Sequence, residues 1–304
     1  MILVCGSAGD GVTRFFCKRL QIMGAQNRLF DLSRYATAHR ITQCRSDRGS
    51  GSISWPGDSI RTSELTGAFV RDLSRWSDQK DSASDPALAV ALHAEKSLGL
   101  ESFLAELDCV VVNRVASNWS NHSKPYQTLV IRDGIFEIPR TLITNNAQDA
   151  RRFYEETGGQ IIHKSSSGHS FGTRLVGLDD LCSLLSTRDT PVQLQERVAG
   201  TDIRVHVVRE QIFATRIRSQ AIDYRRAEHD EIRLEAIELP MSIAAECVRI
   251  TAQFGLLFSG VDLRETVDGR YYCFEVNPVP DFAFYEERTG QQISVALRDL
   301  LTGN

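Results

Sequence analysis

Two carboxylates and one amide near the C-terminus could act together if the chain folds as its pattern predicts. Asp268-Gly269 separates two runs of alternating apolar residues, the pattern of a β-hairpin with a two-residue turn. Counting back from that turn places Asp262 opposite Glu275, and directly opposed residues have Cβ atoms about 4.5–5.5 Å apart. Asn277 follows Glu275 by two residues, so it is expected on the same face.

This oxygen-only set suits a hard cation. A site with only three protein ligands suits a Mg²⁺ ion whose remaining ligands are nucleotide phosphates. The opposite face, with Leu263, Phe274 and Val276, is expected to point into a core. Opposed like charges destabilise a sheet unless a cation lies between them. The alternative interpretation is a surface hairpin whose acids pair with Arg264 or Arg270.

Lys164 ends a short apolar run and leads into residues 165–172, which are rich in Ser and Gly. Such a loop can lay backbone N–H groups over phosphate oxygens while the lysine supplies positive charge. The Walker A order is absent. We therefore expect a phosphate-binding lid, with an exposed hairpin tip and a solvated lysine as the alternative. The glycine-rich turn over residues 6–11 is interpreted as a packing turn.

A strand ending in Gln195-Glu196-Arg197-Val198 could read an adenine edge through its backbone. Asp202 follows, and then a set of arginines. Guanidinium groups pair with carboxylates and phosphates through two parallel hydrogen bonds, so the set suggests an acidic or phosphorylated ligand. The alternative is that these arginines form the solvated face of the strands. The set comprises Arg204, Arg216, Arg218, Arg225 and Arg226.

Composition excludes several classes of function. The net charge of −4 and pI of about 6.0 give no reason to expect nucleic-acid or membrane-surface binding. Apolar runs fall short of the roughly 20 residues of a membrane span. The seven cysteines are scattered without a Cys-x-x-Cys pair, which favours reduced thiols in a cytoplasm over disulfides or a zinc site.

The chain divides into three expected segments, residues 1–122, 123–192 and 193–304. In the first, an apolar run over residues 2–5, a glycine turn and a helical pattern over 12–23 predict the opening unit of a Rossmann-like α/β lobe. The second is expected to be a central α+β lobe carrying the lid loop. The third is expected to be an α+β lobe with the acidic hairpin and a final helix over 293–301.

In their order, these motifs resemble ATP-grasp ligases, in particular the ribosomal-protein glutamate-ligase type and the peptide maturases that make microviridin-like graspetides. The resemblance covers residues 109–290 well and the N-terminal hundred loosely. It rests on Lys124, Lys164 with its loop, Gln195-Glu196-x-Val198, Asp202-Ile-Arg204, Asp223-Tyr-Arg225, Gly260-x-Asp262 and Phe274-Glu275-x-Asn277-Pro278.

The resemblance implies an α/β (α+β) ATP-grasp fold in which two α+β lobes clamp a nucleotide beside a Rossmann-like lobe. It also implies a role for each motif residue. Lys124 and Lys164 would contact ATP phosphates, Gln195, Glu196 and Val198 would frame the adenine, Asp202 would hold the ribose region, and Asp262, Glu275 and Asn277 would hold one or two Mg²⁺ ions.

The implied catalytic arginines are Arg225, Arg218 and Arg204, which would steady an acyl phosphate or a substrate carboxylate. The stretch after Arg225 is closer to the maturases than to the glutamate ligases, which favours a peptide substrate over a free amino acid. The expected activity is a cytoplasmic, ADP-forming ligation of a carboxylate to an amine or hydroxyl.

The alternatives are a small-molecule carboxylate–amine ligase of the same fold, a non-catalytic nucleotide-binding protein and a Rossmann-type dehydrogenase. The misplaced glycines count against the dehydrogenase. The sequence leaves open the substrate, the bond formed and the oligomeric state, with a homodimer as one candidate assembly.

Overall fold

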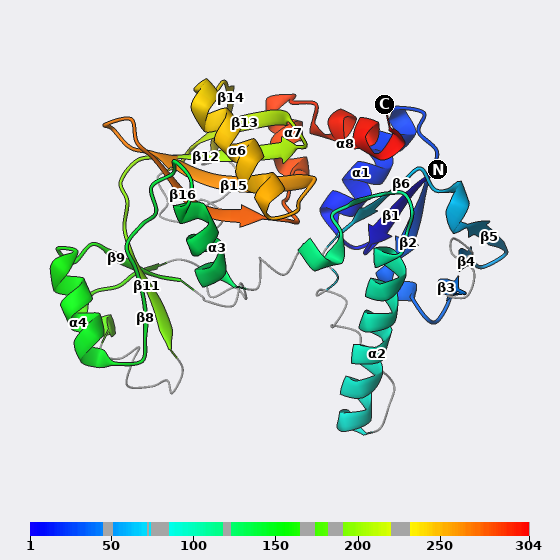
Figure 1. Cartoon of the computed structure of the whole chain (residues 1–304), viewed down its shortest axis with the longest axis horizontal. Coiled ribbons are helices and arrows are strands. Elements are labelled where there is room, and N and C mark those ends of the chain that lie inside the picture. The colour runs from blue at the N-terminus through cyan, green and yellow to red at the C-terminus, as the bar shows by residue number, and fades with distance from the viewer. Residues whose placement is uncertain are drawn as a thin grey trace.

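The computed structural model describes residues 1–44, 51–71, 73, 85–117, 123–164, 174–181, 191–219 and 232–303. The expected lid loop over 165–172 and the expected catalytic Arg225 lie outside these described residues. Four sheets organise the described part of the chain. Figure 1 shows the N-terminal lobe at one end of the molecule and the central sheet at the other.

The N-terminal lobe is built on a parallel sheet in the order β2-β1-β6-β7. Alternation along β1 sends Ile2 and Val4 to one face, where α1 and α8 pack, and Leu3 and Cys5 to the other, against α2. The predicted strand, glycine turn and helix are thereby confirmed. The bounds are β1 (Ile2–Gly6), α1 (Gly11–Ile22), β2 (Asn27–Asp31), β6 (Gly67–Val70), α2 (Pro86–Ala105) and β7 (Val110–Val112).

A small antiparallel sheet extends this lobe. It comprises β3 (Arg40–Gln43), β4 (Gly51–Trp55) and β5 (Asp58–Arg61), with short 3₁₀ helices η1 (Leu32–Arg34) and η2 (Thr62–Glu64) beside it. Trp55 pairs with Asp58 across a turn in which Gly57 has a φ of 78°. The Trp55 indole donates to the Leu29 carbonyl, which ties the small sheet to the parallel one.

The central lobe is an antiparallel sheet in the order β10-β9-β11-β8, with α4 packed on one face through Ala150 and Phe153. Because β11 pairs with β8 and β9, we place the boundary of this lobe after Glu196 rather than before residue 193. The bounds are β8 (Thr141–Thr144), α4 (Ala147–Glu156), β9 (Ile161–Lys164), β10 (Arg174–Leu175) and β11 (Val192–Glu196).

The third lobe is a five-stranded antiparallel sheet in the order β14-β13-β12-β15-β16. One face is covered by α6 and, unexpectedly, by α3, which the sequence assigned to the central segment. Ile131 of α3 and Ile250 of α6 share a core with Val205 and Val261. The bounds are α3 (Lys124–Arg132), β12 (Thr201–Val208), β13 (Gln211–Arg218), β14 (Arg233–Ile237), α6 (Met241–Gln253), β15 (Phe258–Glu265) and β16 (Tyr271–Asn277).

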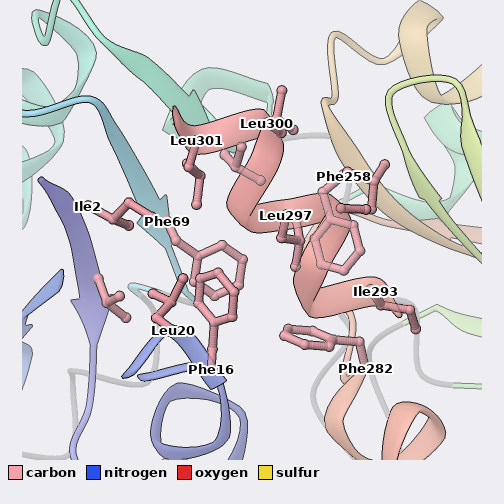
Figure 2. Close-up of a cluster of buried hydrophobic side chains, with 14 of the residues drawn as sticks. Ile2, Phe16, Leu20, Phe69, Phe258, Phe282, Ile293, Leu297, Leu300 and Leu301 are labelled. Atoms are coloured by element: carbon pink, nitrogen blue, oxygen red, sulfur yellow. The ribbon is translucent and has the colours of Figure 1, made fainter. Parts of the chain in front are cut away.

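The chain ends by returning to its beginning. After α7 (Ala283–Thr289), α8 (Ile293–Thr302) packs beside α1 and β6 (Figure 1). Figure 2 shows side chains from both chain ends in one apolar cluster, among them Phe16, Phe69 and Leu297. A Cβ added at Gly67 would lie 2.5 Å from the Leu301 carbonyl oxygen, so this contact requires glycine. The N-terminal and third lobes therefore share a single core.

Candidate active site

The acidic hairpin pairs as predicted, although its turn differs. Asp262 lies opposite Glu275, and Asn277 follows on the same face opposite Gly260. The turn is one residue longer than predicted, because Thr266 donates its N–H to the Arg270 carbonyl. A β-bulge between Asp262 and Leu263 shifts the register back. The predicted pair is therefore confirmed, and the predicted two-residue turn is wrong.

The bulge also corrects the expected core face. Leu263 and Val276 are buried as expected, but Cys273 takes the core position in place of Phe274. Phe274 is half-buried and faces two cations instead. The Lys164 ammonium lies 4.8 Å and the Arg264 guanidinium 5.3 Å from the centre of its ring. Since Lys164 belongs to the central sheet, Phe274 links the central and third lobes at the cleft between their two sheets.

Each acid of the pair has its own basic partner. Arg204 Nη1 lies 2.6 Å from Asp262 Oδ1, and Lys124 Nζ lies 2.9 Å from Glu275 Oε2. Arg204 stands opposite Asp262 on β12 and is 5 % exposed. Two opposed carboxylates are tolerated here because each is neutralised locally.

The alternative partners of the acids are engaged elsewhere. Arg264 makes hydrogen bonds of 2.6 and 2.8 Å to Asp202 and a third to the Val198 carbonyl. Arg270 pairs with Asp268 in the exposed turn. The interpretation as a surface hairpin paired through these two arginines is therefore wrong. Arg264 instead fixes the connection between the central and third sheets.

Lys124 is positioned by a side chain that the sequence did not single out. Gln127, one turn further along α3, donates to the Val276 carbonyl at 3.0 Å and accepts from the Val276 N–H at 3.1 Å. Its amide thus takes the place of a neighbouring strand at the edge of the sheet, next to Glu275. Gln127 is 2 % exposed. A glutamine on the buried face of an amphipathic helix was the sequence signal that could have identified this residue.

The N-terminal lobe supports the loop that follows the hairpin. Arg71 donates to the carbonyls of Val279 and Pro280 and pairs with Asp10 at the start of α1. Asn113 donates to the Pro278 carbonyl and accepts from the Phe258 N–H. These contacts assign the lobe a supporting role for the position of Asn277.

The packing around residue 260 explains why the Gly-x-Asp motif has a glycine there. A Cβ at this position would lie 2.7 Å from Pro280 Cβ and 2.9 Å from Arg204 Nη1. The Arg204 guanidinium therefore crosses the bare backbone of residue 260, donating to its carbonyl at 3.3 Å, to reach Asp262. Glycine is needed for this approach, because any side chain would displace the arginine.

The central sheet turns a polar row toward the same cleft. Gln195 lies opposite Ile162 and Gln193 opposite Lys164, on the face away from α4. An open hollow of about 530 Å³ lies where the connection from β11 to β12 passes the hairpin, and Glu196, Val198 and Tyr272 are among its lining residues. Of the three expected adenine residues, Glu196 and Val198 line this hollow, and Gln195 lies on the face of β11 away from α4.

Among the described members of the expected arginine set, Arg204 and Arg218 lie on opposite faces of the third sheet. Arg218 and Arg216 point to one face of β13, and Thr215 points to the other. Arg204 is the cross-strand partner of Thr215, so Arg218 and Arg204 are on opposite faces of the sheet. It is largely exposed and pairs with Glu235 of β14. The expectation that Arg218 faces the cleft with Arg204 is therefore corrected.

Buried cysteines do not supply a nucleophile. Burial raises the pKa of the Cys5 thiol to about 12 and that of Cys273 well above its ordinary value. Both thiols stay protonated at neutral pH, and the thiolate is the reactive form.

Over the described ranges, no three His, Cys, Asp or Glu side chains cluster to hold a metal by themselves. The pair of acids with Asn277 accordingly leaves coordination positions for ligand oxygens.

A buried histidine under the site gives a pH prediction. His206 is fully buried and its Nε2 donates to the Asp281 carbonyl at 3.0 Å. Burial, and then the Arg204 charge, lower the pKa of His206 to about 3. Between this value and an unfolded pKa of about 6.5, the unfolded chain binds one more proton, so acid destabilises the fold.

We expect this residue to lower the free energy of unfolding by about 2 kcal/mol on going from neutral pH to about pH 5. His206→Phe should remove that share of the pH dependence, as measured by urea unfolding across the range. An unchanged slope in the variant would show that His206 is not the group responsible.

Two sheets that face each other across a cleft, one carrying a lysine and the other a paired-acid hairpin, define the ATP-grasp class. The chain belongs to the RimK-like ATP-grasp family, whose model matches residues 120–301. No curated protein sequence matches it. Within the described ranges, no helix has both the length and the apolar content to cross a membrane.

Solved structures resemble the whole chain. Macrocyclase MdnC from Microcystis aeruginosa, bound with its precursor peptide MdnA, is 24 % identical with a TM-score of 0.87 and full coverage of both chains. ATP-grasp ligase PsnB, complexed with a precursor variant, Mg and ADP, is 27 % identical, with a TM-score of 0.82 and coverage of 99 % and 97 %. A Chryseobacterium gregarium RiPP-associated ATP-grasp ligase, in complex with ADP and a leader and core peptide, is 19 % identical, with a TM-score of 0.83 and coverage of 99 % of this chain and 96 % of that chain.

Proposed function

We propose that this chain is an ATP- and Mg²⁺-dependent, ADP-forming ligase that joins a carboxylate to an amine or hydroxyl of a peptide. The observation that carries the proposal is the Asp262–Glu275 pair, held by Arg204 and Lys124 in an ATP-grasp fold, with Lys164 of the central sheet over the ring of the neighbouring Phe274. A peptide substrate is supported by the likeness to PsnB, described with its minimal precursor, Mg and ADP.

The chemistry needs positioning and charge neutralisation more than a protein nucleophile. A carboxylate oxygen attacks the γ-phosphorus of ATP, and ADP leaves as the acyl phosphate forms. An amine or hydroxyl then attacks the acyl carbon, its proton is lost to solvent, and phosphate leaves. In this scheme Lys124 and Lys164 hold ATP phosphates, and Arg204 and Arg225 face the acyl phosphate or the substrate carboxylate.

Glu196 and Val198 frame the base in the same scheme, with Gln195 beside them, and Asp202 lies near the ribose. Asp262, Glu275 and Asn277 would hold Mg²⁺, which supplies Lewis-acid charge next to the phosphates. Their donor chemistry fits this ion, because all three offer oxygen ligands. In the structure without ligand, Arg204 and Lys124 pair with the two carboxylates that would hold the ion.

The same ion pairs predict that metal and nucleotide bind together. Mg²⁺ alone must displace Arg204 and Lys124 from the acids, whereas ATP offers these bases new anionic partners. We expect weak Mg²⁺ binding without nucleotide, and a Lys124→Met variant that binds Mg²⁺ alone more tightly but nucleotide less tightly than the wild type. Calorimetry with Mg²⁺ and AMPPNP measures both, and a Mg²⁺ affinity independent of nucleotide would contradict the prediction.

The proposed function is tested with candidate peptides that combine Asp or Glu with Ser, Thr or Lys acceptors, including peptides encoded beside the gene. We expect peptide-dependent ADP release, with one ADP for each water lost from the peptide by mass spectrometry. With ¹⁸O in the side-chain carboxylates, one label should appear in the released phosphate. Modified peptide without labelled phosphate would contradict the acyl phosphate route.

A further inference from the structure

The Pro139 carbonyl, the Thr141 hydroxyl and the Gln195 side-chain amide are linked in that order by hydrogen bonds. Thr141 Oγ1 donates to the Pro139 carbonyl at 3.0 Å. Gln195 Nε2 donates to the same Thr141 Oγ1 at 3.0 Å. A hydroxyl has one hydrogen, and Thr141 uses it on Pro139, so toward Gln195 this hydroxyl acts as an acceptor. The amide of Gln195 is thereby held with its nitrogen toward Thr141 and its oxygen turned away.

That oxygen is buried and, among the described residues, has no hydrogen-bond partner. Gln195 as a whole is 5 % exposed. A buried polar atom left unsatisfied destabilises the fold, so its retention suggests that a ligand donor completes it. Gln195 projects from the face of β11 that lies away from α4, the face that it shares with Gln193 and its partner Lys164. A donor group of a ligand bound between the two sheets would complete this oxygen.

We propose that Thr141 is a positioning residue that fixes Gln195 as a hydrogen-bond acceptor and so selects a purine with an amino group at position 6. The inference rests on the proposed nucleotide site. Adenine offers an N–H at this position, and hypoxanthine offers a carbonyl oxygen. Two acceptors face each other in the second case, and the locked amide cannot turn to relieve the conflict.

Removal of the Thr141 hydroxyl should release this lock. In Thr141→Val the Gln195 amide loses the acceptor for its nitrogen and becomes free to turn, presenting an N–H donor that suits hypoxanthine. Thr141→Ser keeps the hydroxyl and should keep the lock. Thr141 lies opposite Gln195 on the edge strand β8 and is half-buried, so both substitutions change little volume.

The test compares the affinities of ATP and ITP, with Mg²⁺ and without peptide, by calorimetry. We expect wild type and Thr141→Ser to bind ATP roughly tenfold or more tightly than ITP. In Thr141→Val the ratio should fall about tenfold, through weaker ATP and tighter ITP binding. The ratio separates this lock from base recognition by the backbone of Glu196, which Thr141→Val leaves intact.

An ATP-to-ITP ratio in Thr141→Val equal to that of the wild type would overturn the inference, and so would equal affinities in the wild type. In both cases tight ATP binding would leave the proposed function standing. If the wild type binds neither nucleotide, the proposed function fails and the inference with it. Should Thr141→Val not fold, Gln195→Met gives the same readout, since it removes the acceptor and should bring the two affinities close together.

Discussion

Glu275→Ala should reduce peptide-dependent ADP release by roughly a hundredfold or more, the scale of losing one group that stabilises transition-state charge. Glu275 faces Asp262 and contacts Lys124 at 2.9 Å. Its loss leaves Lys124 without its carboxylate and the proposed metal with Asp262 and Asn277. Affinity for Mg²⁺ and AMPPNP should fall in parallel, as measured by calorimetry.

The matched control for this variant is Asp149→Asn, which changes an acid on the outer surface of α4 that pairs with Arg152. It should leave ADP release and nucleotide affinity at wild-type values. Full activity in Glu275→Ala, with the control behaving as expected, would remove Glu275 from the site.

Arg204→Met should lower the free energy of unfolding by about 3–5 kcal/mol and abolish turnover. The reason is that Asp262 would keep a largely buried charge without this counter-ion, and the Gly260 carbonyl would lose a donor. Asp262→Asn alone should cost less. The double variant should be more stable than the sum of the two single effects predicts, because neither unpaired charge remains, yet it should stay inactive.

Urea unfolding of the wild type and the three variants measures this coupling. Strictly additive losses would show that the Arg204–Asp262 contact contributes no interaction energy. Recovered turnover in the double variant would contradict the proposed role of Asp262 in metal binding.

The acid pair was predictable because strand periodicity carries register over short distances. The longer turn and the bulge at Phe274 were not, since each alone alters the register and only their combination restores Asp262 opposite Glu275. The face of the sheet on which Arg218 lies could have been predicted by the same count of strand register. The Arg209-Glu210 turn pairs Val208 with Gln211, and continuing that ladder separates Arg218 from Arg204.

Packing between distant segments was beyond the sequence. The apolar faces of α3 and α8 indicate burial, but not that α3 covers the third sheet or that α8 joins the N-terminal lobe. Long-range polar contacts such as Gln127 with Val276 depend on that packing. The lid loop over 165–172, the role of Arg225, a cytoplasmic location and a homodimer stay predictions.

The placement of Mg²⁺ and nucleotide in a structure of the complex tests the central claim most directly. In crystals grown with AMPPNP and Mg²⁺, we expect the metal within about 2.0–2.1 Å of oxygens from Asp262, Glu275 or Asn277 and of the phosphates. Lys124 and Arg204 should have turned toward anionic oxygens of the ligand. Nucleotide bound elsewhere, with the Arg204–Asp262 and Lys124–Glu275 pairs intact, would contradict the account.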